Sequence, residues 1–218
     1  LNKRKVMLGI ITIEDIVDVM VEEQTEDVLQ MGGVDKEEKL DSTVWQSVKM
    51  RFPWLFINLI TAFLAAMTVK AFESTIAKVV ALSSIMSIVT GMGGNAGTQT
   101  VSIIIRNIAM GKIKLKDTWK LLLKEFLLGL INGAGIGLIT GVVVYFIYGN
   151  FYLGLIIFLA MIGNLIIAGV AGLLIPLLLH KLHFDPALSS SIFLTTATDV
   201  LGFFFFLSLA KLFLPLLV

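Results

Sequence analysis

Five long apolar stretches fill most of this 218-residue chain, and each is long enough to cross a lipid bilayer as a helix of about 20 residues. They cover about residues 53–72, 79–105, 121–148, 152–179 and 187–216. Hydrophobic residues make up 57% of the chain and charged residues 15%, whereas soluble domains contain roughly 45–50% and about 25%. We therefore expect an all-α membrane protein with five transmembrane helices per subunit.

The first 41 residues, here called the head, depart from this pattern because they hold eleven of the sixteen acidic residues. A short β-branched run over 5–13 predicts one strand, and the residues after Thr12 predict a helix to about Met31. One strand and one helix cannot form a core alone. We expect a cytoplasmic strand–helix remnant of a larger domain whose other part precedes this chain.

A second amphipathic pattern covers residues 35–52, just before the first apolar stretch. Charged residues surround an apolar side that consists of Leu40, Val44, Trp45 and Val48. The pattern predicts a separate connecting helix that lies at the membrane surface.

Basic residues predict which side of the membrane each link faces. The link between the second and third spans carries Arg106, Lys112, Lys114, Lys116, Lys120 and Lys124, whereas the link at 148–150 has no lysine or arginine. By the positive-inside rule, the N-terminus is cytoplasmic and the C-terminus lies outside the cytoplasmic membrane. Glu73 and Glu125 lie at the ends of spans, and we assign them no site.

The second span contains a polar, glycine-rich segment over 90–100, near its middle. Glycine weakens a helix, and freed backbone carbonyls are tolerated at membrane depth only inside protein or beside water. The segment predicts an unwound or kinked stretch that offers oxygens to a pathway. By contrast, the glycines of the third span, at 129, 133, 137 and 141, and the residues around Asn164 in the fourth span predict close helix packing.

The fifth span contains Asp199, which lies about 20 Å along a helix that begins near Pro186. A carboxylate at this depth costs at least ~2.5–3.5 kcal/mol unless it faces water or a partner, and no basic residue lies at a comparable depth. Thr195 and Thr196 precede it by one turn. A protonated aspartate bonded between helices is one interpretation, and a cation or proton site is the other, which we favour.

A hydrated divalent cation fits the oxygens of the second and fifth spans, because Mg²⁺ prefers hard oxygen ligands and keeps several waters. These residues alone do not select Mg²⁺ over Ca²⁺, Mn²⁺, Na⁺ or protons. The acidic residues of the head also have two interpretations, a solvated helix face or a site for hard divalent cations.

Several motifs resemble the MgtE magnesium channel family. Gly93-Gly94-Asn95-Ala96-Gly97-Thr98-Gln99, followed by Arg106 and Gly111, is similar to its second-span signature. Asp185-Pro186-Ala187 and the run from Thr195 to Gly202 are similar to its fifth-span signature. The run from Gly9 to Ile16 and Thr25-Glu26-Asp27 resemble the end of the CBS domain that such proteins carry.

The resemblance implies a homodimeric channel in the lipid bilayer, with a pore on the dimer axis that cytosolic Mg²⁺ gates. Its domains would be a CBS remnant over 1–32, a connecting plug helix over 33–52 and a five-helix pore domain over 53–218. The implied pore residues for the metal are Asp199, Asn95, Gly93, Gly94 and Thr195. The implied regulatory metal residues are Asp15, Asp18, Glu23, Glu26 and Asp27. Mg²⁺ would be both transported and regulatory ion, with Mn²⁺, Co²⁺ and Ca²⁺ left open as substitutes.

Two other classes of function compete with a channel. A secondary exchanger would couple a divalent cation to Na⁺ or H⁺ at Asp199, and a broken second span fits such transporters. An intramembrane hydrolase needs an activated nucleophile or paired aspartates, but His180 and His183 lie at the membrane boundary and Asp199 has no second aspartate within the spans. We therefore expect no enzyme. A net charge of +1 predicts no nucleic-acid partner, and no other protein partner is evident.

Overall fold

The computed structural model describes residues 11–35, 37–113 and 118–217, without the side chains of 22–25, 27, 28, 188 and 189. All regular structure in these residues is helical. The helices are α1 (Ile13–Met31), α2 (Val44–Ala71), α3 (Glu73–Lys78), α4 (Ala81–Ala109), α5 (Thr118–Tyr148), α6 (Phe151–Lys181), α7 (Pro186–Leu212) and α8 (Leu214–Leu217).

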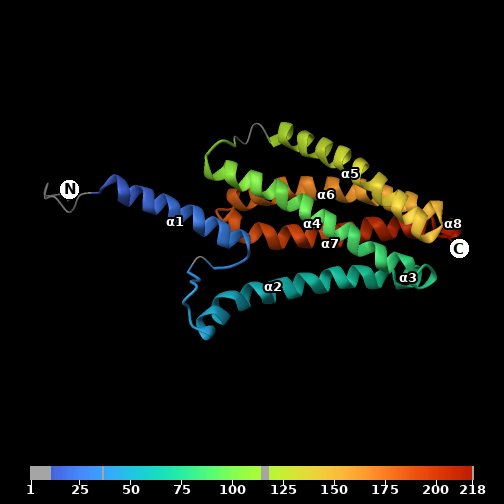
Figure 1. Cartoon of the computed structure of the whole chain (residues 1–218), viewed down its shortest axis with the longest axis horizontal. Helices are drawn as coiled ribbons and strands as arrows, with labels where there is room; N and C mark the ends of the chain where they lie inside the picture. Colours follow the sequence, from blue (N-terminus) through green and yellow to red (C-terminus); the bar gives the residue numbers. More distant parts are fainter. Residues whose placement is uncertain (1–10, 36, 114–117, 218) are drawn as a thin grey trace.

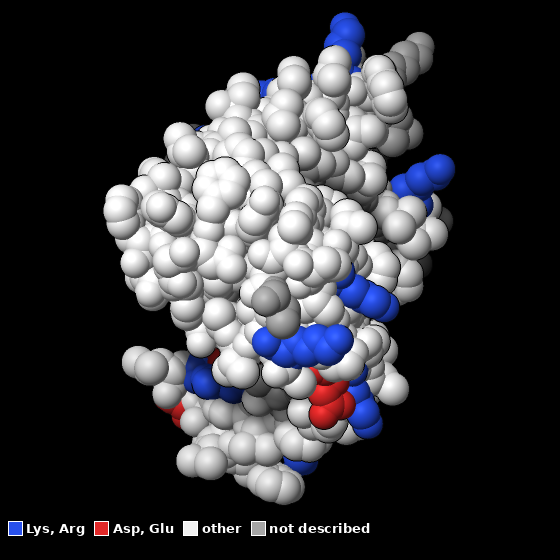
Figure 2. Space-filling model, turned by 90° about the vertical axis from the view of Figure 1, so that its right-hand side faces the viewer, with Lys and Arg blue, Asp and Glu red and all other residues white. Residues whose placement is uncertain are grey.

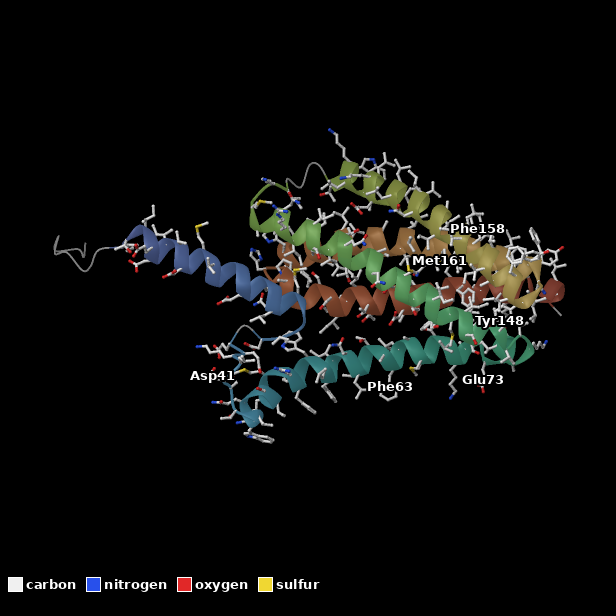
Figure 3. All side chains as sticks on the ribbon, viewed as in Figure 1. Asp41, Phe63, Glu73, Tyr148, Phe158 and Met161 are labelled. Carbon is white, nitrogen blue, oxygen red and sulfur yellow. The ribbon has the colours of Figure 1, made fainter. Side chains whose placement is uncertain are left out.

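Five long helices, α2 and α4 to α7, run up and down along a common direction, while α1 extends from one end of this bundle (Figure 1). Helix α6 lies at the centre, because it packs against α4, α5 and α7. Its residues Ile156, Ile157, Ala160 and Met161 are fully buried. On the outside, Phe63 of α2 points away from the other helices (Figure 3), as expected for a side chain that faces lipid.

Four helices within the described residues are both long and apolar enough to cross a membrane. They are α2, α5, α6 and the part of α7 from Ser190 to Leu212. Helix α4 has the required length, but its polar residues keep it out of this group. The chain is therefore a multi-pass membrane protein with four candidate spans. The bundle end at which α2 and α7 finish presents a mostly uncharged surface (Figure 2).

Local sequence sets the beginnings of the helices. At α7, Asp185 accepts a hydrogen bond from the backbone N–H of Ala187 at 2.9 Å, and Pro186 occupies the first turn, where its missing N–H costs nothing. At α1, Thr12 and Asp15 bond each other reciprocally. The predicted extent of α1, from about Thr12 to Met31, is confirmed.

The predicted strand over 5–13 lies mostly outside the described residues. Ile11 and Thr12 have no regular structure, and Ile13 already belongs to α1. The strand over residues 5–10 stays a prediction.

The predicted separate helix over 35–52 is wrong. The described residues before Val44 form turns, and those from Val44 onward are the first turns of α2, which continues through Pro53 into the membrane. The backbone N–H of Thr43 donates to the side chain of Gln46 at 2.9 Å, and this cap begins the helix at Val44. An apolar stripe shows which side of a segment is buried, but it does not mark where a helix begins.

One ion pair ties the turns before α2 to the helix itself. Arg51 donates to the carboxylate of Glu38 at 2.8 Å, and the Glu38 side chain is only 6% exposed. The hydroxyl group of Ser47, and then the guanidinium group of Arg51, hold the pKa of Glu38 below its usual value of about 4.5.

The lowered pKa of Glu38 predicts a pH dependence of stability. The contact should stabilise the fold at every pH above about 4.5 and lose its effect as the pH falls through the lowered pKa of the folded state. Thermal unfolding in detergent should show a lower melting temperature for Glu38→Gln than for the unchanged chain at pH 7. This difference should shrink below pH 4.5, and a difference that stays constant down to pH 3 would contradict the assignment.

Glycines allow α5 and α6 to touch through their backbones, as the spacing predicts. Gly129, Gly133, Gly137 and Gly141 are all buried against α6. A Cβ atom on Gly133 would lie 2.6 Å from the Cα of Ile162, and one on Gly129 would lie 2.7 Å from the Cα of Ile166. Backbone atoms cannot swing aside, so any larger residue has to push the helices apart.

This contact gives a prediction with a matched control on the same helix. Gly133→Ala should lower the free energy of unfolding by about 1–3 kcal/mol, the usual cost of overpacking. Gly135→Ala should be neutral or stabilising, because nothing lies within 4 Å of its added Cβ and alanine favours helix. Unfolding of both variants in detergent checks this, and equal effects would argue against the close contact.

Candidate functional site

Helix α4 is continuous from Ala81 to Ala109, so the predicted break over 90–100 is wrong. Glycine costs a helix only about 0.5–1 kcal/mol per residue. Two of these glycines have close neighbours on other helices. A Cβ on Gly97 would lie 2.6 Å from Cδ1 of Leu194, and one on Gly93 would lie 2.8 Å from Oδ1 of Asn164. Close packing thus accounts for these two glycines without any unwinding.

One exposed side of α4 carries a row of small and polar residues, with Ile88 and Ile103 exposed beside it. The residues of this row follow one another at intervals of three or four and are all small or hydrogen-bonding: Ser84, Ser87, Gly91, Asn95, Thr98 and Ser102. All are exposed except Ser102, which is half-buried. We call this set the polar stripe. The opposite side of α4, with Val89 and Val101, is buried against α6 and α7.

The hydroxyl groups of the polar stripe donate to their own helix. Ser87 donates to the carbonyl of Ser84 at 3.0 Å, and Thr98 and Ser102 donate to carbonyls one turn earlier at 2.8 Å. Because these three O–H protons are used in this way, the lone pairs of their oxygens remain for an outside partner. Such a surface accepts hydrogen bonds, as the waters around a cation require.

Asp199 lies on α7 in a half-buried position, and Thr195, one turn earlier, is exposed. The Thr195 hydroxyl donates to the carbonyl of Ile192 at 3.0 Å, so its oxygen is left as an acceptor. Asp199 has no hydrogen bond or ion pair with any described residue. The interpretation of a protonated aspartate bonded between helices therefore finds no partner in the described part of the chain.

Asn164 of α6 joins the helices that carry Asn95 and Asp199. Its side chain is fully buried, and its amide nitrogen donates to the backbone carbonyl of Val89 on α4. A Cβ on Gly202 of α7 would lie 2.6 Å from Oδ1 of Asn164. Asn164 thus lies between Gly93 of α4 and Gly202 of α7. Gly93 is two residues before Asn95, and Gly202 is three residues after Asp199.

The five predicted pore residues divide into two groups. Asn95, Gly94 and Thr195 are fully or partly exposed, and Asp199 is half-buried, so all four are open to an ion. Gly93 instead faces the interior, where it makes room for Asn164. The metal-binding role of each of the five residues stays a prediction. The surroundings of Gly93 explain a packing role for it instead.

The comparisons with known proteins agree with this geometry. A family model described as "MgtE: Divalent cation transporter" matches residues 86–209, more than half of the chain and nearly all of α4 to α7. The chain belongs to the MgtE family of divalent cation transporters. This is a family of transporters and not of enzymes.

Three relatives are each named "Magnesium transporter MgtE". The one from Enterococcus faecalis is 36% identical over 208 residues, which cover 95% of this chain and 46% of the relative. Those from Bacillus subtilis and Thermus thermophilus are 31% and 32% identical over 213 residues, with 47% and 46% of their lengths covered. The chain thus spans about half the length of these MgtE relatives.

The predicted regulatory residues do not form a metal site within the described part of the chain. No group of three or more acidic or histidine side chains there could hold an ion. Asp15 and Asp18 are exposed, and hydrogen bonds from the backbone N–H and the hydroxyl of Thr12 lower the pKa of Asp15. The side chains of Glu23 and Asp27 lie outside the description, and Glu26 is half-buried. Their regulatory role stays a prediction.

The end of α1 contacts the bundle where α4 ends and α7 begins. Gln30 is buried, and Met31 packs against a cluster formed by Val101, Ile105, Ala187 and Leu194. The head thus contacts α7, and Met31 packs against a cluster that also contains residues of α4.

Sequence reasoning assigned no site to Glu125, but the structure buries it. Its side chain is 9% exposed and accepts a hydrogen bond from the Thr100 hydroxyl of α4 at 3.0 Å. A cavity of about 140 Å³ beside it is also lined by Gln99, Lys124 and Asn132. The sequence held one signal for this contact. Glu125 is an acidic residue within the helical pattern of a span, and such a residue requires a partner.

One glycine of α4, Gly94, and one of α7, Gly202, give a prediction about the free energy of unfolding. Gly202→Ala should lower the free energy of unfolding by about 1–3 kcal/mol, because its Cβ would displace buried Asn164. Gly94→Ala should leave stability unchanged or raise it by up to about 1 kcal/mol, since it has free space inside a continuous helix. Unfolding in detergent tests both, and a destabilised Gly94→Ala variant would indicate that α4 is not helical there.

Proposed function

We propose that this chain forms a membrane pathway for hydrated divalent cations, with Mg²⁺ as the principal ion, along the polar stripe of α4 and Asp199 of α7. The observation that carries the proposal is the polar stripe itself. A helix that crosses a membrane cannot expose an amide such as that of Asn95 to lipid at low cost, and the serine and threonine oxygens in the same row remain open as acceptors. The names of the three relatives support Mg²⁺ as the ion.

Chain direction supports α4 as a fifth span. Helix α2 finishes at the end of the bundle opposite to the one where α5 begins (Figure 1). The chain has to return through α4 to reach α5. With 29 residues, α4 is about 43 Å long, which exceeds the roughly 30 Å of a hydrocarbon core.

A second copy of the chain is the natural cover for the polar stripe. A water-filled path between two copies would bring two stripes and two Asp199 side chains together, with a charge of −2 when both are ionised. This arrangement agrees with the dimeric pore that the family resemblance implies. The glycine-lined contact of α5 with α6 is already filled within one subunit, so the polar stripe remains for the contact between subunits.

The chemistry of the path suits Mg²⁺ because this ion gives up its waters reluctantly. Hydroxyl oxygens that accept but do not donate can bind those waters, and Asp199 supplies the attractive charge. Asn95 and Thr195 add further oxygens near the level of the carboxylate. Protein oxygens do not have to replace the waters of the ion, which agrees with one acidic side chain, Asp199, on the proposed path.

The charge distribution supports a cytoplasmic N-terminus. Basic residues gather at the end of the bundle where α1, the end of α4 and the start of α5 lie, including Arg106, Lys112, Lys120 and Lys124. Regulation by cytosolic Mg²⁺ would begin at the acidic residues of the head and reach the pathway through Met31. The exchanger alternative depended on a broken second span, and the continuous α4 removes that support.

Mg²⁺ flux into proteoliposomes tests the proposal directly. Asp199→Asn should reduce the flux at least about tenfold at matched protein incorporation, because it removes a negative charge from the proposed path. Flux of the unchanged chain should need no Na⁺ or H⁺ gradient. Asp41→Asn, an exposed aspartate before α2, is the matched control and should keep the full flux.

Two results would overturn parts of this proposal. Equal flux in Asp199→Asn and the unchanged chain would exclude Asp199 from the pathway. Flux that strictly requires an opposing Na⁺ or H⁺ gradient would identify an exchanger instead of a channel.

A further inference from the structure

Two side-chain hydrogen bonds join α4 to other helices within the described part of the chain. The amide of Asn164 on α6 donates to the carbonyl of Val89, and the hydroxyl of Thr100 donates to Glu125 on α5 at 3.0 Å. The side chains of Asn164, Thr100 and Glu125 are each at most 9% exposed. Both bonds are therefore largely buried, and the cavity of about 140 Å³ adjoins the bond of Thr100 with Glu125.

The two bonds hold the same side of α4. Val89 and Thr100 are eleven residues apart, which corresponds to three turns and about 16 Å along the helix. The polar stripe, with Asn95 and Thr98, lies on the opposite side. Two directional contacts at separate levels of one side resist both rotation and sliding of the helix, which a single contact would not.

Packing and hydrogen bonds act together on α4. Its buried side combines apolar side chains, such as Leu82 and Val101, with Gly93 and Gly97, which present no side chain of their own to a neighbour. Apolar contact is non-directional, and lipid chains compete with it equally well inside a membrane. Hydrogen bonds have a required geometry, so they add a directional constraint to this packing.

We propose that Asn164 and Glu125 are positioning residues that set the rotation of α4, and that this rotation determines which cations the pathway accepts. The first half of the proposal stands on the contacts alone. The second half rests on the proposed function. Asn164 also touches Gly202, so it fixes the position of Asn95 on α4 relative to Asp199 on α7.

Cysteine labelling measures the rotation without any transport. The chain contains no cysteine, so Ser87→Cys and Ser102→Cys each give a single reactive position on the polar stripe. The rate of reaction with a water-soluble, membrane-impermeant maleimide reports how far each position faces water. Asn164→Leu should change the rate at position 87, and Thr100→Val the rate at position 102, each about two- to tenfold, the equivalent of one hydrogen bond.

Matched controls separate rotation from a general loosening. Thr140→Val removes a hydroxyl that bonds only its own helix, α5, and Asn58→Leu removes an exposed amide on α2. Both should leave the labelling rates unchanged. Unchanged rates in the double variant Asn164→Leu/Thr100→Val would overturn the proposal. If Asn164→Leu does not fold, Thr100→Val alone decides, because valine keeps the shape of threonine.

The ratio of Mg²⁺ to Ca²⁺ flux in proteoliposomes tests the second half. Thr100→Val should shift this ratio about two- to tenfold, whereas Glu125→Gln should keep it, because the amide oxygen still accepts from Thr100. An equal shift in Glu125→Gln would show that the charge of Glu125 acts on the ion and would overturn the positioning role. Absence of any flux in the unchanged chain would refute the proposed function, while the labelling result would still decide the rotation.

Discussion

A lipid bilayer offers no hydrogen-bond partners, and this constraint explains the placement of several polar groups in the bundle. Among the described buried side-chain atoms of the bundle, Oδ1 of Asn164 and Oγ of Ser190 are exceptions without a partner. The hydroxyl groups of Ser87, Thr98 and Ser102 donate into their own helix, which removes the need for an outside acceptor. Asn164 and Thr100 donate to groups on other helices. Asp199 has neither kind of partner within the described residues. In a bilayer, such a carboxylate requires water or a cation, so the same constraint that explains these hydrogen bonds sets this residue apart.

Glycine serves two different purposes in the bundle. On α5 it brings two backbones into contact, as at Gly133 beside Ile162. At Gly93 and Gly202 it makes room for one polar side chain between three helices. The first use is common in membrane proteins and sets only the distance between helices. The second use positions the Asn164 amide, which forms a directional hydrogen bond, between the helices. It thereby links the packing of the helices to Asn95 and Asp199, which are close in sequence to Gly93 and Gly202.

Features that depend on local composition could be predicted from the sequence, and features that depend on distant partners could not. The long helices end close to the predicted spans, and all but α2 also begin close to them, because apolar length and end signals such as Asp185-Pro186 are local. Helix α2 begins nine residues before its predicted span. The break in α4 was predicted because the helix penalty of glycine is visible in the sequence, whereas the contact of Gly93 with Asn164 is not. Asn164 and Glu125 were missed for the same reason, since their bonding partners lie 75 and 25 residues away.

The position of α1 limits how the head could control the pathway. Helix α1 packs mainly against α7, and Met31 at its end packs against the cluster of Val101, Ile105, Ala187 and Leu194, which joins α4 to α7. Leu194 of α7 also fills the space beside Gly97 of α4. A shift of α1 would therefore act on α7 first and reach α4 through this cluster. Within the part of the chain that the structure describes, the head could influence the proposed rotation of α4 only by this indirect route.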